Sequence, residues 1–214
     1  MTAVASASAQ ARRADLRIGV LALQGDVEAH CDVLADLGAI PVPVRKPADA
    51  HDLAGLVLPG GESTTMSLLL ESSGLTPLIA KQLAAGLPVL GTCAGMILLS
   101  KEILDGRRDQ ICFGAIDLVV RRNAFGRQVE SFETDLNVKG FDGPMHAVFI
   151  RAPYVESAGP AVDILASVDA AGTGAERPVV CTQGNVIVAA FHPELAGDGR
   201  LHEMLIGLIG SEGD

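Results

Sequence analysis

Tryptophan is absent from this sequence, tyrosine occurs once, and aromatic residues make up only 3% of the chain. The core must therefore be built from Ala, Val, Ile and Leu, and hydrophobic residues reach 49% of the composition. A chain of 214 residues with this composition fits one globular α/β domain with a large core. We assign that domain to residues 16–214.

Basic residues are scarce, with 16 Lys and Arg against 26 Asp and Glu, so the formal net charge is −10. Neutralising a phosphate backbone requires clustered Lys and Arg, and the one basic cluster, Arg121, Arg122 and Arg127, is short. We therefore expect no nucleic-acid partner.

Cysteine occurs four times, without a C-x-x-C pair or a spacing typical of metal sites, so neither a disulfide framework nor a bound metal is expected. Residues 1–15 are rich in Ala and Ser but lack the apolar segment of a signal peptide, and we expect them to be a disordered leader. No uninterrupted apolar run is long enough to cross a bilayer. We expect a cytoplasmic protein with no membrane association.

Short runs of Val, Ile and Leu alternate with helical stretches, which predicts a single-domain, doubly wound, mostly parallel sheet with additional antiparallel strands. Asp26 and Gly38 are candidate cap residues of the first helix, and Ser63 or Thr64 could cap the second. The expected strands are Leu16–Leu23, Ile40–Val44, Gly55–Leu58, Leu87–Leu90, Ile116–Val120, His146–Ile150, Val162–Val168, Val179–Thr182 and Val186–Phe191. The expected helices are Val27–Leu37, Ser63–Glu71, Pro77–Ala85, one beginning at Met96, and Gly199–Ile209.

Cys93 lies between two glycines in the segment GTCAG, at a predicted junction of strand and helix. A tight turn there would lift the thiol above the sheet, as in the nucleophile elbow of hydrolases, and the N-terminus of the helix would favour a thiolate. Taken alone, the pattern also fits a buried structural cysteine. For Cys31, Cys112 and Cys181 the structural interpretation is preferred.

His192 and Glu194 follow the last predicted strand, separated by Pro193. Residues two apart in extended chain point the same way, so Glu194 could accept the imidazole N–H and leave the other ring nitrogen for the Cys93 thiol. The alternative is a surface His–Glu pair that closes a strand. The other four histidines lack such a setting and are interpreted as solvated or structural: His30, His51, His146 and His202.

The turn Leu58-Pro59-Gly60-Gly61 ends the third predicted strand at the same edge of the sheet. Two glycines before a helix allow a backbone N–H to face developing negative charge, so we take the amides of Gly61 and Ala94 as oxyanion donors. A plain glycine-rich turn fits as well, but the segment lacks the ending of a nucleotide-binding P-loop.

Together these three segments resemble the class I, triad-type glutamine amidotransferases. The resemblance extends to the glutaminase subunits of pyridoxal phosphate synthases and covers the chain from about residue 16 to the last helix. The segments that carry it are IGVLALQG (Ile18–Gly25), LPGGESTTM (Leu58–Met66), GTCAGM (Gly91–Met96), RNAFGRQVESFE (Arg122–Glu133), FIRAP (Phe149–Pro153) and FHPEL (Phe191–Leu195).

This resemblance implies hydrolysis of L-glutamine to glutamate and ammonia by a triad of Cys93, His192 and Glu194, without a cofactor or metal. It implies a separate synthase subunit that accepts the ammonia to build pyridoxal 5'-phosphate. It also implies a set of glutamine-binding residues, of which arginine suits the substrate's α-carboxylate: Gly61, Glu62, Ser63, Arg122, Ile150 and Arg151.

Two alternatives remain open on the sequence. One is the glutaminase of another amidotransferase, with the same chemistry and a different partner. The other is a non-catalytic or redox-sensing module of the same fold, which would need neither the HPE segment nor the double-glycine turn.

Overall fold

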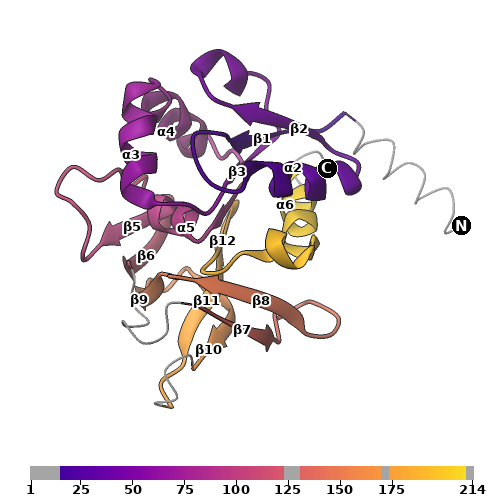
Figure 1. Ribbon diagram of the computed structural model, residues 1–214, viewed down its shortest axis with the longest axis vertical. Helices are drawn as coiled ribbons and strands as arrows, with labels where there is room; N and C mark the ends of the chain where they lie inside the picture. Colours follow the sequence, from indigo (N-terminus) through magenta and orange to yellow (C-terminus); the bar gives the residue numbers. More distant parts are fainter. Residues whose placement is uncertain (1–14, 123–130, 170–173, 211–214) are drawn as a thin grey trace, which may run out of the picture.

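The computed structural model describes residues 15–122, 131–169 and 174–210 (Figure 1). A seven-stranded sheet forms its centre, with five neighbouring parallel strands and two antiparallel strands at one side. In order across the sheet, the strands are β10 (Asp163–Val168), β11 (Arg177–Gln183), β12 (Val186–Ala189), β4 (Val89–Thr92), β3 (Gly55–Leu58), β1 (Arg17–Leu21) and β2 (Ile40–Val44).

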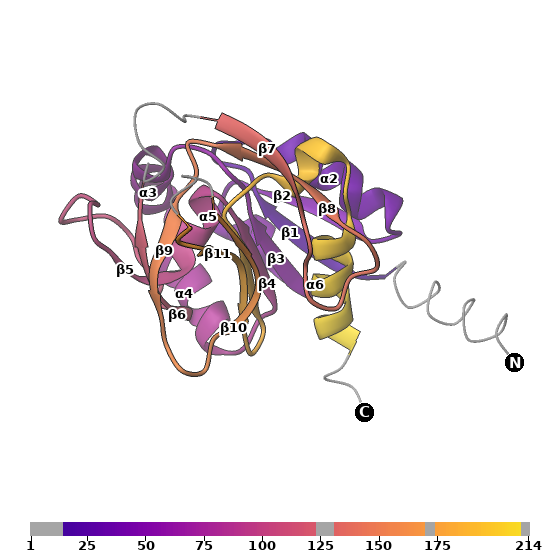
Figure 2. The ribbon, with the colours of Figure 1, turned by 90° about the horizontal axis from the view of Figure 1, so that it is seen from below.

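The central strands are apolar along their length because both faces of the sheet are covered. Every residue of β3, β4 and β12 is buried, so their sequences run as apolar segments instead of alternating with polar residues. Two helices pack on one face, and three lie on the other (Figure 2). The first pair is α2 (Val27–Asp36) and α6 (Arg200–Gly210), and the second group is α3 (Ser63–Ser72), α4 (Thr76–Ala84) and α5 (Ala94–Leu99).

Two small sheets pack beside the central one. A hairpin of β7 and β8 contacts the short 3-10 helix η2 (Pro193–Ala196) that follows β12, and another 3-10 helix, η1 (Pro47–Ala50), follows β2. Phe149 of the hairpin stacks on Phe132 with ring centroids 4.4 Å apart and meets Phe191 at 5.4 Å. The small sheets contain β5 (Ser100–Ile103), β6 (Ile116–Arg121) and β9 (Tyr154–Ala158), and β7 (Ser131–Leu136) with β8 (Met145–Ile150).

The predicted fold class is confirmed, and each predicted strand and helix has a counterpart within about two residues at its ends. Three strands were not predicted: β5, β7 and β9. Their exposed positions carry Lys, Glu, Ser and Asp, so they lack the apolar runs on which the prediction relied.

The cap predictions need one correction. Glu62, and not Ser63 or Thr64, is the N-cap of α3, and its carboxylate accepts the backbone N–H groups of Thr64 and Thr65. Asp26 does occupy the N-cap position of α2, although its side chain makes no capping hydrogen bond there.

Two sequence predictions lie outside the described residues. These are the leader, apart from Asp15, and most of the RNAFGRQ segment, of which only Arg122 is described. Among the described helices, none combines the length and the apolar character needed to cross a bilayer.

Candidate active site

Cys93 lies on a sharp turn between β4 and α5. Its φ and ψ of +48° and −102° are sparsely populated for a residue with a side chain, and such strain concentrates at functional sites. The backbone N–H of Cys93 donates to the carbonyl of Ala189 at 2.8 Å, which fixes the turn to the end of β12. The thiol is therefore held at the carboxyl ends of two parallel strands, where open α/β sheets bind their ligands.

Glycine at position 95 lets the turn pack against the neighbouring strand. A Cβ atom there would overlap the backbone carbonyl of Leu58, the last residue of β3. The absence of a side chain at Gly95 therefore allows the backbones of the Cys93 turn and of β3 to approach closely.

His192 and Glu194 form a hydrogen-bonded pair, with Nδ1 of His192 2.8 Å from Oε1 of Glu194. The pair arises differently from the way the sequence argument expected, because β12 ends at Ala189, His192 is the N-cap of η2 and Glu194 lies within η2. The backbone N–H of His192 donates to Val148 of β8 at 2.9 Å. The hairpin therefore helps to hold the imidazole in place.

The imidazole of His192 lies between two acidic groups, the thiol of Cys93 and the carboxyl group of Glu194. Burial lowers the pKa of His192, but the Cys93 thiol and the Glu194 carboxylate outweigh burial and raise it to about 10. Burial likewise raises the pKa of Glu194, whereas contacts with His192 and His30 lower it to about 2. At neutral pH this arrangement favours a carboxylate at Glu194 and a protonated imidazole at His192.

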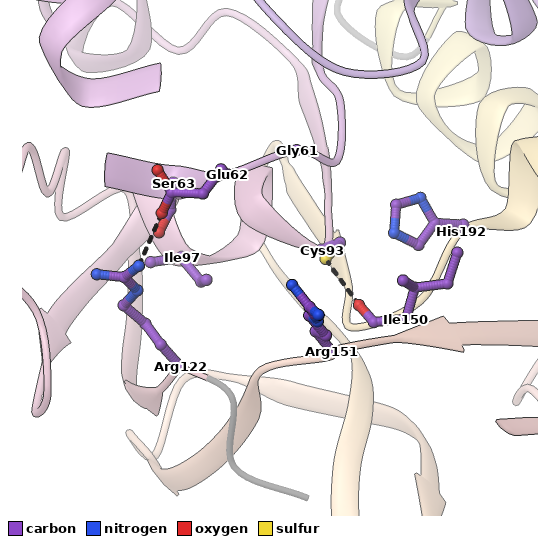
Figure 3. A pocket seen from close by; sticks show the side chains of 9 residues that line it. All are labelled: Gly61, Glu62, Ser63, Cys93, Ile97, Arg122, Ile150, Arg151 and His192. Carbon is purple, nitrogen blue, oxygen red and sulfur yellow. Dashed lines mark hydrogen bonds and ion pairs between the residues drawn. The ribbon is translucent and has the colours of Figure 1, made fainter. Parts of the chain in front are cut away.

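A cavity of about 360 Å³ opens in front of Cys93 (Figure 3). The Cys93 sulfur faces the backbone carbonyl of Ile150 at 3.9 Å on one side of the cavity. The cavity is lined by Gly61, Glu62, Ser63, Cys93, Ile97, Arg122, Ile150, Arg151 and His192.

Eight of the residues singled out from the sequence line this cavity, together with Ile97, which was not predicted. Glu194 lies behind His192 and is almost fully buried, and Ala94 is the first residue of α5, next to Cys93. Among the described residues, no group of three or more His, Cys, Asp or Glu side chains is arranged to hold a metal ion. The structure thus brings together segments that lie far apart in the sequence.

An ion pair forms the end of the cavity opposite His192 (Figure 3). Nη2 of Arg122 is 2.8 Å from Oε1 of Glu62, and Nη1 is 3.2 Å from Oε1 of Gln110. Partial burial raises the pKa of Glu62, but the N–H and hydroxyl groups of Thr64 and Thr65 lower it to about 2. The cavity therefore offers a cation and an anion side by side, away from the thiol.

Besides Ile97, four residues near the site were missed. Gln24 accepts the backbone N–H of Glu62 at 3.2 Å, and Gln110 holds Arg122. The other two are His30 and His202, which are fully buried behind Glu194. The LQG block that precedes α2 is a signal for Gln24, whereas the contact between α2 and α6 has no signature in the sequence.

The four histidines that the sequence left as solvated or structural divide between the two interpretations. His51 and His146 are exposed, and His30 and His202 are part of the interior. No local pattern in the sequence distinguishes the buried histidines from the exposed ones.

Comparison with known proteins identifies the family. The profile of the SNO glutamine amidotransferase family matches residues 20–210. This chain belongs to that family.

Two bacterial relatives of the chain share one name. The chain is 55% identical over 198 residues to the protein named pyridoxal 5'-phosphate synthase subunit PdxT of Frankia alni, covering 92% of this chain and 96% of that protein. It is 54% identical over 192 residues to the protein of the same name from Mycobacteroides abscessus, covering 90% and 96%.

Solved structures agree with the fold. One described as a glutamine amidotransferase is 44% identical, with a TM-score of 0.82, and the match covers 90% of this chain and 98% of the other. A chain in the structure of PurLQS from Thermotoga maritima, at 17% identity and a TM-score of 0.64 over 90% and 98% of the two chains, shares the fold.

Proposed function

We propose that this chain hydrolyses L-glutamine to L-glutamate and ammonia, with Cys93, His192 and Glu194 as its catalytic triad. The observation that carries the proposal is the cavity that a strained Cys93 and His192 line together, with Glu194 hydrogen-bonded to His192 and with Arg122 and Glu62 at the far end. Membership in a glutamine amidotransferase family supports the choice of substrate.

Glutamine matches the chemistry of the two ends of this cavity. Its α-carboxylate suits the guanidinium of Arg122, and its α-ammonium suits the carboxylate of Glu62. The side-chain amide then points toward Cys93, and the neighbouring contacts come from Gly61, Ser63, Ile150 and Arg151. This binding mode separates recognition of the amino acid from the chemistry on its amide.

The reaction has two halves. The Cys93 thiolate attacks the amide carbon, the backbone amides of Gly61 and Ala94 stabilise the oxyanion, and protonated His192 donates its proton to the departing nitrogen. Ammonia leaves, and His192 then takes a proton from the water that hydrolyses the glutamyl thioester. Glu194 keeps the imidazole oriented and stabilises its charged form throughout.

Ammonia can act as a nucleophile only if it reaches an acceptor before it is protonated. The two relatives named above are PdxT subunits of pyridoxal 5'-phosphate synthase, and by this likeness we assign the ammonia to a separate synthase subunit that builds the vitamin B6 cofactor. We assign the glutaminase domain to residues 16–214 and the reaction to the cytoplasm, in keeping with the four free cysteines of the chain.

A labelling experiment tests the nucleophile. A glutamine-analogue electrophile should modify the wild-type chain once, and the label should be lost in Cys93→Ala but retained in Cys31→Ala, Cys112→Ala and Cys181→Ala. Burial raises the pKa of Cys181 to about 12, so that thiol is a suitable unreactive control. Retention of the label in Cys93→Ala would refute the assignment.

A second experiment tests the partner. Glutamate formation is measured for the chain by itself and with the synthase subunit, and pyridoxal phosphate formation is followed in the same mixture. We expect weak glutaminase activity for the isolated chain, faster turnover in the complex, and no cofactor synthesis from glutamine with Cys93→Ala. Added ammonium should restore synthesis in that variant.

A further inference from the structure

A buried pair of histidines lies directly behind Glu194. Nε2 of His30 is 3.5 Å from Oε2 of Glu194 and 3.3 Å from Oγ1 of Thr92, and Nδ1 of His30 is 2.8 Å from Nε2 of His202. All four side chains are buried, and neither histidine is among the residues that line the cavity. The pair comes from α2 and α6, on the face of the sheet opposite α5.

The second carboxylate oxygen of Glu194 lacks a hydrogen-bond donor among the described residues. Oε1 receives the hydrogen bond from His192, whereas Oε2 is buried and has no hydrogen-bond partner at ordinary distance among the described residues. A buried carboxylate with an unpaired oxygen is costly, and Nε2 of His30 lies 3.5 Å from this oxygen. Hydrogen bonds in catalytic sites are often long before the substrate complex forms.

The contacts of His202 decide which nitrogen of His30 carries the proton. Nδ1 of His202 is buried without a partner among the described residues, so leaving it unprotonated avoids a buried, unsatisfied N–H. The His202 proton then lies on Nε2 and is donated to Nδ1 of His30. His30 must consequently carry its own proton on Nε2, which faces Glu194 and Thr92.

The opposite arrangement is unfavourable on two counts. A proton on Nδ1 of His30 would leave its Nε2 lone pair facing the Glu194 carboxylate, and it would force a proton onto the unpartnered Nδ1 of His202. Burial and the nearby His30 lower the pKa of His202 to about 3, although the charges of Glu194 and Asp198 act in the opposite direction. His202 therefore remains a neutral donor at physiological pH.

We propose that His30 is a positioning residue that holds Glu194 through its Nε2 proton, and that His202 fixes the tautomer in which His30 can do so. The inference rests on the proposed glutaminase function. The proposed chain of contacts runs from Cys93 through His192, Glu194 and His30 to His202 on α6. His30 therefore acts on the thiol only through Glu194 and His192.

Two substitutions of His30 separate this role from simple packing. His30→Gln keeps an amide nitrogen near the position of Nε2, whereas His30→Asn keeps polar atoms only near Nδ1. In the complex with the synthase subunit, we expect His30→Asn to lower kcat by about 10- to 100-fold, the effect of losing one hydrogen bond to a charged group, with KM for glutamine unchanged. His30→Gln should recover most of the loss.

The matched control is His146→Gln, since His146 is an exposed histidine on β8 that pairs with Asp135 and Glu133 outside the cavity. It should match the wild type in kcat and KM. Equal losses in His30→Asn and His30→Gln, or a loss that appears in KM alone, would overturn the proposal.

A double-mutant cycle provides a readout that a structural role would not produce. If His30 acts through Glu194, then His30→Asn should cost little, about threefold or less, when added to Glu194→Gln. Where turnover is too slow to measure, the variants are compared by the rate at which the glutamine-analogue electrophile labels Cys93. Fully additive losses would show that His30 acts elsewhere.

Nitrogen NMR of the histidine-labelled wild-type chain tests the tautomers without any substitution. We expect Nε2 of both His30 and His202 to carry a proton, and Nδ1 of both to carry none. A His30 protonated on Nδ1 would refute the inference even if the variants of His30 fail to fold. The variant Cys93→Ala separates failure of this inference from failure of the proposed function. Full glutaminase activity in Cys93→Ala would refute the proposed function. If activity depends on Cys93 but is unchanged in His30→Asn, only this inference is refuted.

Discussion

The imidazole of His192 lies directly over the α-carbon of Gly60, so that a Cβ atom at position 60 would overlap Cε1 of the ring and lie 2.9 Å from Nδ1. Gly60 belongs to the turn after β3, and His192 follows β12, two strands away across β4. The first glycine of the PGG segment therefore makes room for the imidazole that we propose as the catalytic base, a role separate from the oxyanion site that we assign to Gly61.

Gly60→Ala should consequently displace His192 while leaving the fold intact. A displacement of about 1 Å can reduce a rate by about 100-fold, and we expect a loss of at least that size in kcat for glutamine hydrolysis. Steady-state kinetics and thermal denaturation are measured together. Gly207→Ala is the control, because a Cβ at position 207 of α6 meets nothing within 4 Å. Near-normal kcat in Gly60→Ala would mean that His192 can shift without consequence.

Arg122→Lys should weaken glutamine binding. Lysine keeps the charge but loses the planar pair of N–H donors that fits a carboxylate, so we expect KM to rise about tenfold or more with a smaller change in kcat. The matched control is Arg121→Lys, since Arg121 is more exposed and pairs with Glu156 on β9. Equal effects of the two substitutions on KM would contradict the assignment of Arg122 to the substrate.

Glu194→Gln should reduce kcat by about 10³- to 10⁴-fold, because an amide in place of the carboxylate no longer stabilises the imidazolium and can favour the wrong tautomer of His192. The glutamine KM should change little, since Glu194 does not line the cavity. Retention of more than a tenth of the wild-type kcat would exclude Glu194 from the triad.

Glu194→Gln should also change how the free energy of unfolding depends on pH under acidic conditions. The pKa of Glu194 is lowered from 4.5 to about 2, so its carboxylate contributes stability that is fully present above about pH 4.5 and is lost as the pH falls through the folded-state value. The difference in unfolding free energy between wild type and Glu194→Gln should be constant between about pH 4.5 and 6.5, where neither Glu194 nor its partner His192 titrates in either state, and should shift against the wild type below about pH 4.5. Urea denaturation at a series of pH values measures this difference, and a constant difference down to about pH 2 would contradict the lowered pKa.

Gly95→Ala should destabilise the protein, because the new methyl group would overlap the carbonyl of Leu58 and force the turn away from β3. Overpacking of this kind typically costs about 1–3 kcal/mol, which thermal or urea denaturation resolves. Gly207→Ala again serves as the control and should be neutral or slightly stabilising in its helix. Unchanged stability of Gly95→Ala would show that the turn has room to relax.

The sequence by itself determined the alternation of buried strands and helices, because apolar runs bounded by glycine are a local property of the chain. It also indicated which segments meet at one edge of the sheet, since a cysteine between glycines, a double-glycine turn and an HPE segment each end a predicted strand. Parallel strands that share one edge then bring Cys93, Gly61 and His192 near one another.

The tertiary structure decided what no local pattern encodes. Polar strands such as β7 form because a partner strand supplies their hydrogen bonds, and the His192–Glu194 contact depends on a turn where extended chain was expected. His30 and His202 look ordinary in the sequence because each lies on a helix, outside the glycine-rich and HPE segments. They meet behind Glu194 only because α2 and α6 pack on the same face of the sheet, and contacts between distant helices are set by packing and not by sequence spacing.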